Sequence, residues 1–257
     1  GYGITITLGA TCLLGSLIPL AAIPATRRAP RQALVALRSI AAPFRDRRYL
    51  ALLGFGCWFS LANGLTQSAQ NIFPYVIGVG VLAMLAMNTV MRVGQLPVSY
   101  WAGQFSDRYG NRPVLILSQL VVATGPLFFL LASREQTWWL LGAWIAWSAY
   151  AGLNICLPNI MLRLAPVQHN AGYIAAYFAV TNIVYALSTV AGGYLFEHFR
   201  NHPPLLLAGY KLTHFELFFW LAWILRTSAV VWLLFVLEPG AWRWPRIVAA
   251  QFSRSGS

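Results

Sequence analysis

Long apolar runs, separated by short stretches of glycine, proline and charged residues, make up most of this chain. A helix that crosses a membrane needs about 20 mostly apolar residues. Seven runs are long enough, and they lie at roughly 3–25, 49–73, 77–102, 113–132, 138–163, 171–196 and 214–237. The pattern therefore predicts an all-α membrane protein with seven transmembrane helices.

The composition supports the same class of protein. Of the 257 residues, 58% are hydrophobic and only 9% are charged, whereas a soluble domain has roughly 25% charged residues. The net charge of +12 raises the question of nucleic acid. The basic residues lie between the apolar runs, however, and not on one polar face, so we expect the lipid bilayer and no nucleic acid as the partner.

The basic residues also predict an orientation, because cytoplasmic loops are enriched in Lys and Arg. With residues 26–48 in the cytoplasm, thirteen arginines lie on that side and three basic residues on the other. This alternation supports the number of spans. We expect a multi-pass protein of a bacterial inner (plasma) membrane with a cytoplasmic C-terminus.

Four regions follow from this arrangement. A first helix (1–25) precedes a basic cytoplasmic loop (26–48), a bundle of six helices (49–237) and a basic tail (238–257). Two interpretations of the loop are open, a short amphipathic helix on the anionic leaflet or a solvated linker. The chain opens with Gly1 directly before an apolar run, so we expect it to be a piece of a longer protein.

Enzymatic chemistry finds no support in the sequence. A phosphate-binding GxxxxGK[ST] loop and an HExxH pair are both missing, and the four histidines lie in loops or at the ends of spans. The three cysteines match no metal or redox spacing. We therefore expect no enzyme activity, no cofactor and no metal. A retinal protein is also disfavoured, because Lys211, the one lysine, lies in a loop.

Polar residues inside the predicted spans recur at steps of three or four, which places them on one face of a helix. In the third span such a face joins Asn88, Arg92, Gln95 and Ser99. In the fifth, Tyr150 and Asn154 precede a kink that we expect at Pro158. For any single amide an interhelical hydrogen bond is the alternative, but the pattern predicts a shared polar cavity. Its candidate lining residues are Asn63, Gln67, Gln70, Arg92, Gln95, Asn154, Tyr177 and Asn182.

Two arginines lie near the middle of predicted spans, where a guanidinium costs roughly 2.5–3.5 kcal/mol on insertion scales. Arg92 is about 16 Å along the helix from Gly103 at ~1.5 Å per residue, and no acid occupies this depth of the spans. We interpret Arg92 as a substrate-contacting or gate residue, with a structural pairing as the alternative. For Arg226 in the last span, we expect packing against a neighbouring helix rather than a substrate contact.

The stretch 103–113, GQFSDRYGNRP, connects the third and fourth spans. Gly103 permits a close helix approach, and Gly110 can adopt a positive φ that ends a helix. Asp107 is placed to meet the positive N-terminus of another helix. Arg108 and Arg112 can pair with acids or lipid phosphates.

This stretch resembles the cytoplasmic-loop signature of the major facilitator superfamily (MFS), G-x-x-x-D-R-x-G-x-R/K-R/K. The matching positions are Gly103, Asp107, Arg108, Gly110 and Arg112, and Pro113 stands where the signature has a basic residue. The resemblance implies the family's C-terminal six-helix bundle, preceded by one helix and the central loop. It also implies that Asp107 is the acid of a conformational latch on the opposite half of the transporter, with Arg108 and Arg112 as its ion-pair partners.

The resemblance implies secondary active transport of a small solute by alternating access, with the N-terminal half of the same transporter as a partner. The alternative is a transporter-like scaffold or sensor that does not transport.

Overall fold

The computed structural model describes residue 11 and residues 42–166, 170–207 and 210–238. Within these residues, six helices are long and apolar enough to cross a membrane, when the helical segment Trp139–Leu164 is counted as one. The chain is thus a multi-pass integral membrane protein. Apart from residue 11, the predicted first span (3–25) lies outside the described residues, as do most of the basic loop and most of the tail. A count of seven helices therefore stays a prediction.

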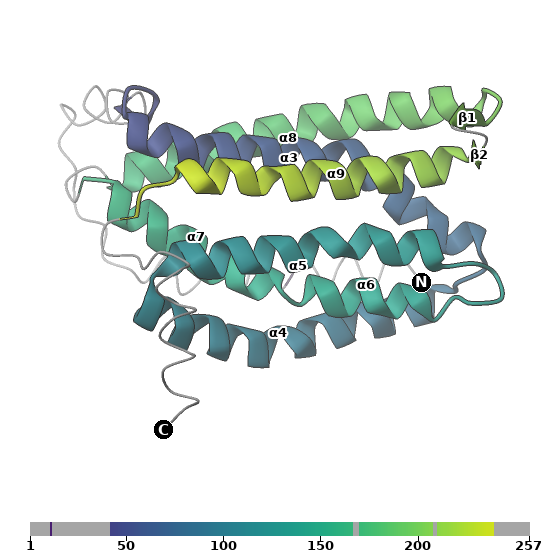
Figure 1. Ribbon diagram of the computed structural model, residues 1–257, viewed down its shortest axis with the longest axis horizontal. Helices are drawn as coiled ribbons and strands as arrows, with labels where there is room; N and C mark the ends of the chain where they lie inside the picture. Colours follow the sequence, from purple (N-terminus) through teal and green to yellow (C-terminus); the bar gives the residue numbers. More distant parts are fainter. Residues whose placement is uncertain (1–10, 12–41, 167–169, 208–209, 239–257) are drawn as a thin grey trace. The chain divides into compact units, whose positions relative to one another are not determined.

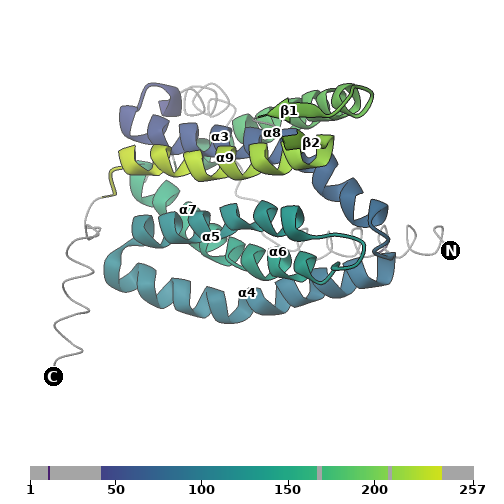
Figure 2. The ribbon, with the colours of Figure 1, turned by 45° about the vertical axis from the view of Figure 1, so that its right-hand side comes forward.

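Each of the other six predicted spans coincides with helical structure, and most of the observed helices extend a few residues beyond the predicted limits. The described elements are η1 (Ala42–Phe44), α3 (Arg47–Val76), α4 (Val81–Tyr109), α5 (Asn111–Leu131), α6 (Trp139–Trp147), α7 (Tyr150–Leu164), α8 (Asn170–Arg200), β1 (Leu205–Leu207), β2 (Tyr210–Leu212) and α9 (His214–Phe235). The strands β1 and β2 form an antiparallel pair between α8 and α9 (Figure 2).

Local chemistry explains where the helices begin and end. The Asp46 side chain accepts a hydrogen bond from the backbone N–H of Arg48 at the start of α3. Thr213 and Glu216 form a reciprocal capping box at the start of α9. Gly110 separates α4 from α5 with φ +94°, a conformation that residues with a side chain rarely adopt. The predicted helix end at Gly110 is confirmed.

The fifth predicted span differs from expectation. A turn at Ser148 and Ala149 divides it into α6 and α7, while Pro158, where we expect a kink, lies inside α7. The Ser148 hydroxyl donates to the carbonyl oxygen of Met91 on α4, and Gly94 lies directly beside it. The break therefore coincides with a close contact between helices that the sequence of this span alone does not predict.

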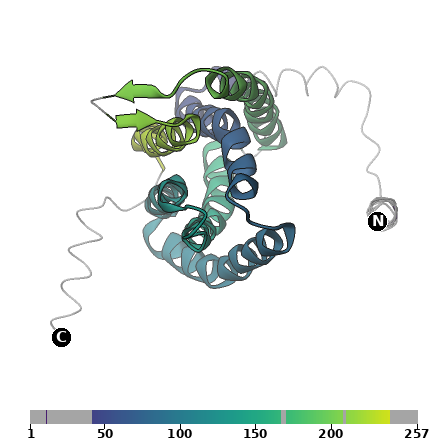
Figure 3. The same cartoon turned by 90° about the vertical axis from the view of Figure 1, so that its right-hand side faces the viewer.

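The helices form two neighbouring groups. α3 packs against α8 and α9, while α4 packs against α5, α6 and α7, and contacts between α5 and α9 join the groups. Figures 1 and 3 show α3, α8 and α9 on one side, and α4 with α5–α7 on the other. This arrangement leaves α3 facing α4, α6 and α7 across the middle of the bundle.

The close contact between α3 and α8 depends on glycines, which have no side chain. A Cβ on Gly192 of α8 would overlap the backbone carbonyl of Leu65, and one on Gly64 of α3 would overlap the Ser188 hydroxyl. Small residues of this kind allow helix backbones to approach closely in membrane proteins.

Buried apolar residues gather in two clusters, one toward each end of the helices. Along α9, one cluster includes Phe218 and Phe219 and the other Ala229 and Leu233, so that Arg226 lies between them. Many large apolar side chains on α4, α8 and α9 are exposed, as expected where a protein faces lipid. The polar groups of the middle therefore lie between two apolar layers.

Candidate functional site

Two adjoining cavities, of about 140 and 440 Å³, lie between α3 and the facing helices α4, α6 and α7. They share Gln67, Asn71, Met84, Trp144, Trp147 and Tyr150. Gln70 and Arg226 belong to the smaller cavity, and Asn88, Arg92, Gln95 and Asn154 to the larger. Amides, a hydroxyl, two guanidiniums and indole rings thus surround one hollow region, which can hold a small solute with both polar and apolar parts.

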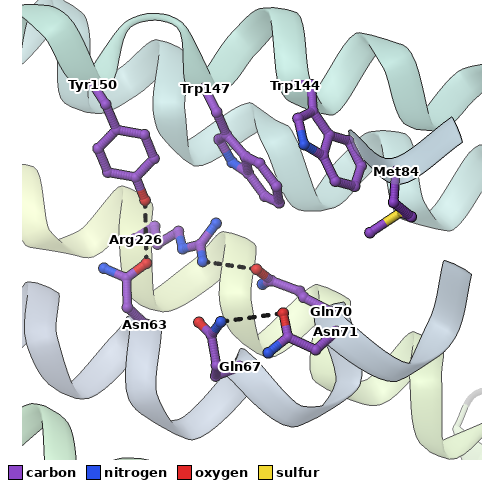
Figure 4. Close-up of a pocket in the computed structure, with 9 residues that line it drawn as sticks. All are labelled: Asn63, Gln67, Gln70, Asn71, Met84, Trp144, Trp147, Tyr150 and Arg226. Carbon is purple, nitrogen blue, oxygen red and sulfur yellow. Dashed lines mark hydrogen bonds between the residues drawn. The ribbon is translucent and has the colours of Figure 1, made fainter. Parts of the chain in front are cut away.

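The amide side chains of α3 form one wall of this region (Figure 4). The Tyr150 hydroxyl donates to Oδ1 of Asn63 over 3.3 Å, and Nε2 of Gln67 donates to Oδ1 of Asn71 over 3.2 Å. Asn63 in turn donates to the backbone oxygen of Phe59. Since an amide carries both donors and acceptors, this wall can replace part of a solute's hydration shell.

The opposite wall is the polar stripe of α4. Arg92 is exposed, and its Nη1 lies 3.5 Å from Oε1 of Gln95, one turn further along. Asn88 donates to the backbone oxygen of Met84 within the same helix. These contacts within α4 leave the guanidinium of Arg92 open toward the larger cavity.

Arg226 closes the smaller cavity from α9. It is 2% exposed, and its Nη2 donates to Oε1 of Gln70 over 3.0 Å. Its guanidinium lies 5.8 Å from the centroid of the Trp147 ring. Behind it, Nε2 of Gln119 on α5 donates to the Arg226 carbonyl oxygen over 2.8 Å. The packing that we expected for Arg226 is present, and the side chain also contributes to the cavity.

Six of the eight residues predicted to line a cavity do line these two. The other two, Tyr177 and Asn182 on α8, line neither. Tyr177 is buried against α3, where its hydroxyl fills the space beside Gly56, and Asn182 is exposed. The polar face of α8 that contains Tyr177 therefore packs against the glycines of α3, because α8 lies on the far side of α3 from the cavities.

The predicted latch residues lie together at the junction of α4 and α5. Asp107 and Arg108 are exposed, and Arg108 lies 5.3 Å from the ring centroid of Tyr109. Arg112 donates to the carbonyl oxygens of Leu233 and Leu234 at the end of α9. Among the residues that the structure describes, the two salt bridges are Arg163–Glu238 and Arg200–Glu197. Asp107 thus forms no ion pair with Arg108 or Arg112 here.

Glu238 is a residue of this junction that the sequence did not single out. Its carboxylate accepts from the backbone N–H groups of Asn111 and Arg112, over 3.1 and 2.7 Å. It also accepts from Nδ2 of Asn111 and forms a 2.8 Å ion pair with Arg163, although its side chain is fully buried. The Glu238 cluster (Asn111, Arg112, Arg163 and Glu238) ties α5, α7 and the end of α9 together.

A carboxylate at this position matches the positive end of a helix, since the first N–H groups of α5 have no partner within the helix. The sequence contains only a weak indication of the role of Glu238. Glu238 follows the last apolar run directly, at the same predicted membrane surface as the basic junction, and an acid among arginines at a helix start is a candidate cap.

Comparison with known proteins agrees with this architecture. The family model of the Major Facilitator Superfamily matches residues 69–252. The major facilitator-type transporter psiT2 of Psilocybe cubensis is 29% identical over 126 residues, which are 49% of this chain and 23% of that protein. The matched region thus spans less than a quarter of the relative's length. Because the family model matches well over half of the chain and the six membrane-capable helices are present, this chain belongs to the Major Facilitator Superfamily.

Proposed function

We propose that this chain is the C-terminal part of a secondary active transporter that moves a small solute across a membrane by alternating access. The observation that carries the proposal is the polar hollow between α3, α4, α6, α7 and α9, which lies between two apolar layers. A group of amides and arginines at this depth of a membrane is costly unless it faces water, a partner or a solute.

We further propose that an N-terminal half of the same transporter faces α4. Between Val81 and Trp101, α4 has no buried residue, although its polar stripe points into the larger cavity. In a transporter of two bundles, a solute site lies where the halves meet, and rocking of one bundle on the other opens it to each side in turn. The solute would bind between the α4 stripe and the α3 amides.

We assign the latch to the same proposal. Asp107 is exposed and, among the described residues, has no hydrogen bond or ion pair, so it is available to the N-terminus of a helix in the other half. Among the described residues, no atom beyond the adjoining turns of α4 lies within 4 Å of a Cβ built on Gly103, which leaves room for a helix there. The junction lies on the side that the distribution of arginines predicts to be cytoplasmic.

The test is solute flux in proteoliposomes with the purified full-length protein, screened with labelled sugars, amino acids and organic anions. Arg92→Ala should weaken solute binding at least tenfold while the protein accumulates normally, because the residue points into the cavity and packs little. Arg134→Ala, which changes an exposed loop arginine, is the matched control. Flux of no solute across the panel would favour the scaffold or sensor, and poor accumulation of Arg92→Ala alone would assign that residue a structural role.

A further inference from the structure

Arg226 carries a buried charge without a counter-charge. Its Nη2 has the neutral amide of Gln70 as its partner, while Nε and Nη1 have no hydrogen-bond partner among the described residues. The position is near the middle of α9, between the two apolar clusters. An uncompensated charge at such a site is strongly unfavourable, and an arginine does not lose its proton in proteins.

Every acidic residue of the chain either binds other groups or lies far from Arg226. All six, Asp46, Asp107, Glu135, Glu197, Glu216 and Glu238, lie in described residues. On α9 and the segment after it, Glu216 caps the helix start and Glu238 binds the start of α5. At ~1.5 Å per residue, Glu216 is about 15 Å from Arg226 along the helix axis. Glu238 lies beyond the end of α9 at Phe235, which is itself about 13 Å from Arg226 along the axis. The helices whose residues contact Arg226, namely α3, α5 and α6, contain no acidic residue.

The unsatisfied groups around Arg226 are mainly donors. Nε and Nη1 of Arg226 and Nε1 of Trp147 are buried without a partner, against one acceptor, Oε1 of Gln119, among the described residues. Nε1 of Trp147 lies against Gly125 of α5, so a ligand that supplies acceptors and a negative charge would complement the two free positions of the Arg226 guanidinium. Arg226 is the arginine that lines the smaller cavity, whereas Arg92 lines the larger one. One guanidinium balances one negative charge, which favours a singly charged carboxylate over a doubly charged phosphate at the smaller cavity.

The rest of the cavity indicates an organic anion. Asn63, Gln67 and Asn71 offer both donors and acceptors to hydroxyl or amide groups, and the ring faces of Trp144 and Trp147 offer an apolar surface. A halide would use only the donors. The volumes of about 140 and 440 Å³ suit a molecule with its acidic group in the smaller cavity and its body in the larger.

We propose that the smaller cavity binds the carboxylate of a small organic monocarboxylate and that Arg226 holds this group, which rests on the transport function proposed above. Because Nε and Nη1 are covered in this structure, binding requires the guanidinium to turn toward the cavity while Gln70 releases or follows it. Gln70 is the positioning residue (Figure 4). Tyr150 lines the same cavity as Arg226, so that in this proposal it lies beside the bound group. Arg92, on the opposite wall, contacts the body of the solute.

The experiment measures binding to the purified full-length protein in lipid nanodiscs by isothermal titration. Acetate, lactate and benzoate are each compared with the neutral amide of the same shape, and sodium chloride at equal ionic strength tests a halide. At least one carboxylate should bind ten times more tightly than its amide. Arg226→Met should remove that difference and Arg226→Lys should keep part of it, because the lysine keeps the charge but not the planar fork. Arg134→Gln should match the wild type.

Equal binding of every acid and its amide, saturable binding of chloride with the same dependence on Arg226, or unchanged carboxylate affinity in Arg226→Met would each overturn the assignment. If Arg226→Met does not fold, Arg226→Lys and the acid–amide comparison in the wild type decide. Transport of a neutral solute that carboxylates do not inhibit would refute this assignment alone. Carboxylate binding through Arg226 without any flux would instead refute the transport function alone.

Discussion

Replacement of Glu238 by glutamine tests whether a single buried carboxylate holds one end of the bundle together. The wild-type carboxylate accepts hydrogen bonds from two backbone N–H groups and one amide, and pairs with Arg163. Glutamine has nearly the same shape but only one acceptor oxygen. Its NH₂ group would face either the N–H of Arg112 or those of Asn111, so that two donors oppose each other.

The expected loss follows from these contacts. A charge at the start of a partly buried helix contributes up to ~2 kcal/mol, and a buried donor without an acceptor costs about 1–3 kcal/mol. The pair with Arg163 adds little, because Arg163 is half-exposed and an exposed ion pair contributes about 0–1 kcal/mol. Together these predict that Glu238→Gln lowers the free energy of unfolding by roughly 3 kcal/mol.

Thermal unfolding of the full-length protein in detergent, followed with a thiol-reactive fluorophore, would measure this loss. Cys156 is buried and Cys57 half-buried, so labelling reports on opening of the helices. We expect the midpoint to fall by roughly 5–10 °C. Glu197→Gln is the matched control, since it removes a carboxylate from an exposed pair with Arg200. Equal midpoints for the two variants would refute the reasoning, because burial would then make no difference.

Two further predictions concern helix packing and the latch. Gly192→Ala should lower the unfolding midpoint, because its new Cβ would overlap the Leu65 carbonyl and overpacking costs roughly 1–3 kcal/mol. Gly193→Ala is the control, because the nearest atom to its new Cβ is the Ser68 hydroxyl oxygen at 3.8 Å. The midpoint of this variant should match or exceed that of the wild type. A lower midpoint for both variants in the same assay would contradict this explanation, because the site of Gly193 has room for a methyl group. Asp107→Asn should impair flux in proteoliposomes while membrane expression and the unfolding midpoint stay unchanged; normal flux would contradict the latch assignment.

Local features of the sequence predicted most of the fold. Apolar run length located all six described spans, because the bilayer imposes a minimum length on each helix. Turn chemistry located the junction between α4 and α5, where Gly110 has φ of +94°. The division between α6 and α7 escaped prediction, since it coincides with a contact between Ser148 and α4 rather than with a helix-breaking residue.

Helical periodicity identified the polar faces of the helices, but it did not predict whether each face lines a cavity or packs against another helix. The faces of α3 and α4 point into the cavities, whereas the equally regular face of α8 packs against α3. Glycines at positions 56 and 64 of α3 leave grooves that Tyr177 and Ser188 fill. A polar stripe opposite a row of glycines on the preceding helices is thus better interpreted as a packing surface, since small residues mark close contacts between membrane helices.

The position of Glu238 also bears on the role of Asp107. Both acids lie at the α4–α5 junction, and the nearest helix N-terminus, that of α5, is already occupied by Glu238. A second carboxylate there would repel the first. Asp107 is exposed at the last turn of α4 and forms no ion pair among the described residues, so under the proposed latch it is available to a helix N-terminus of another bundle. Under the proposed latch the two acids therefore have different roles: Glu238 should determine the stability of this bundle, and Asp107 should affect only its equilibrium with the proposed N-terminal half.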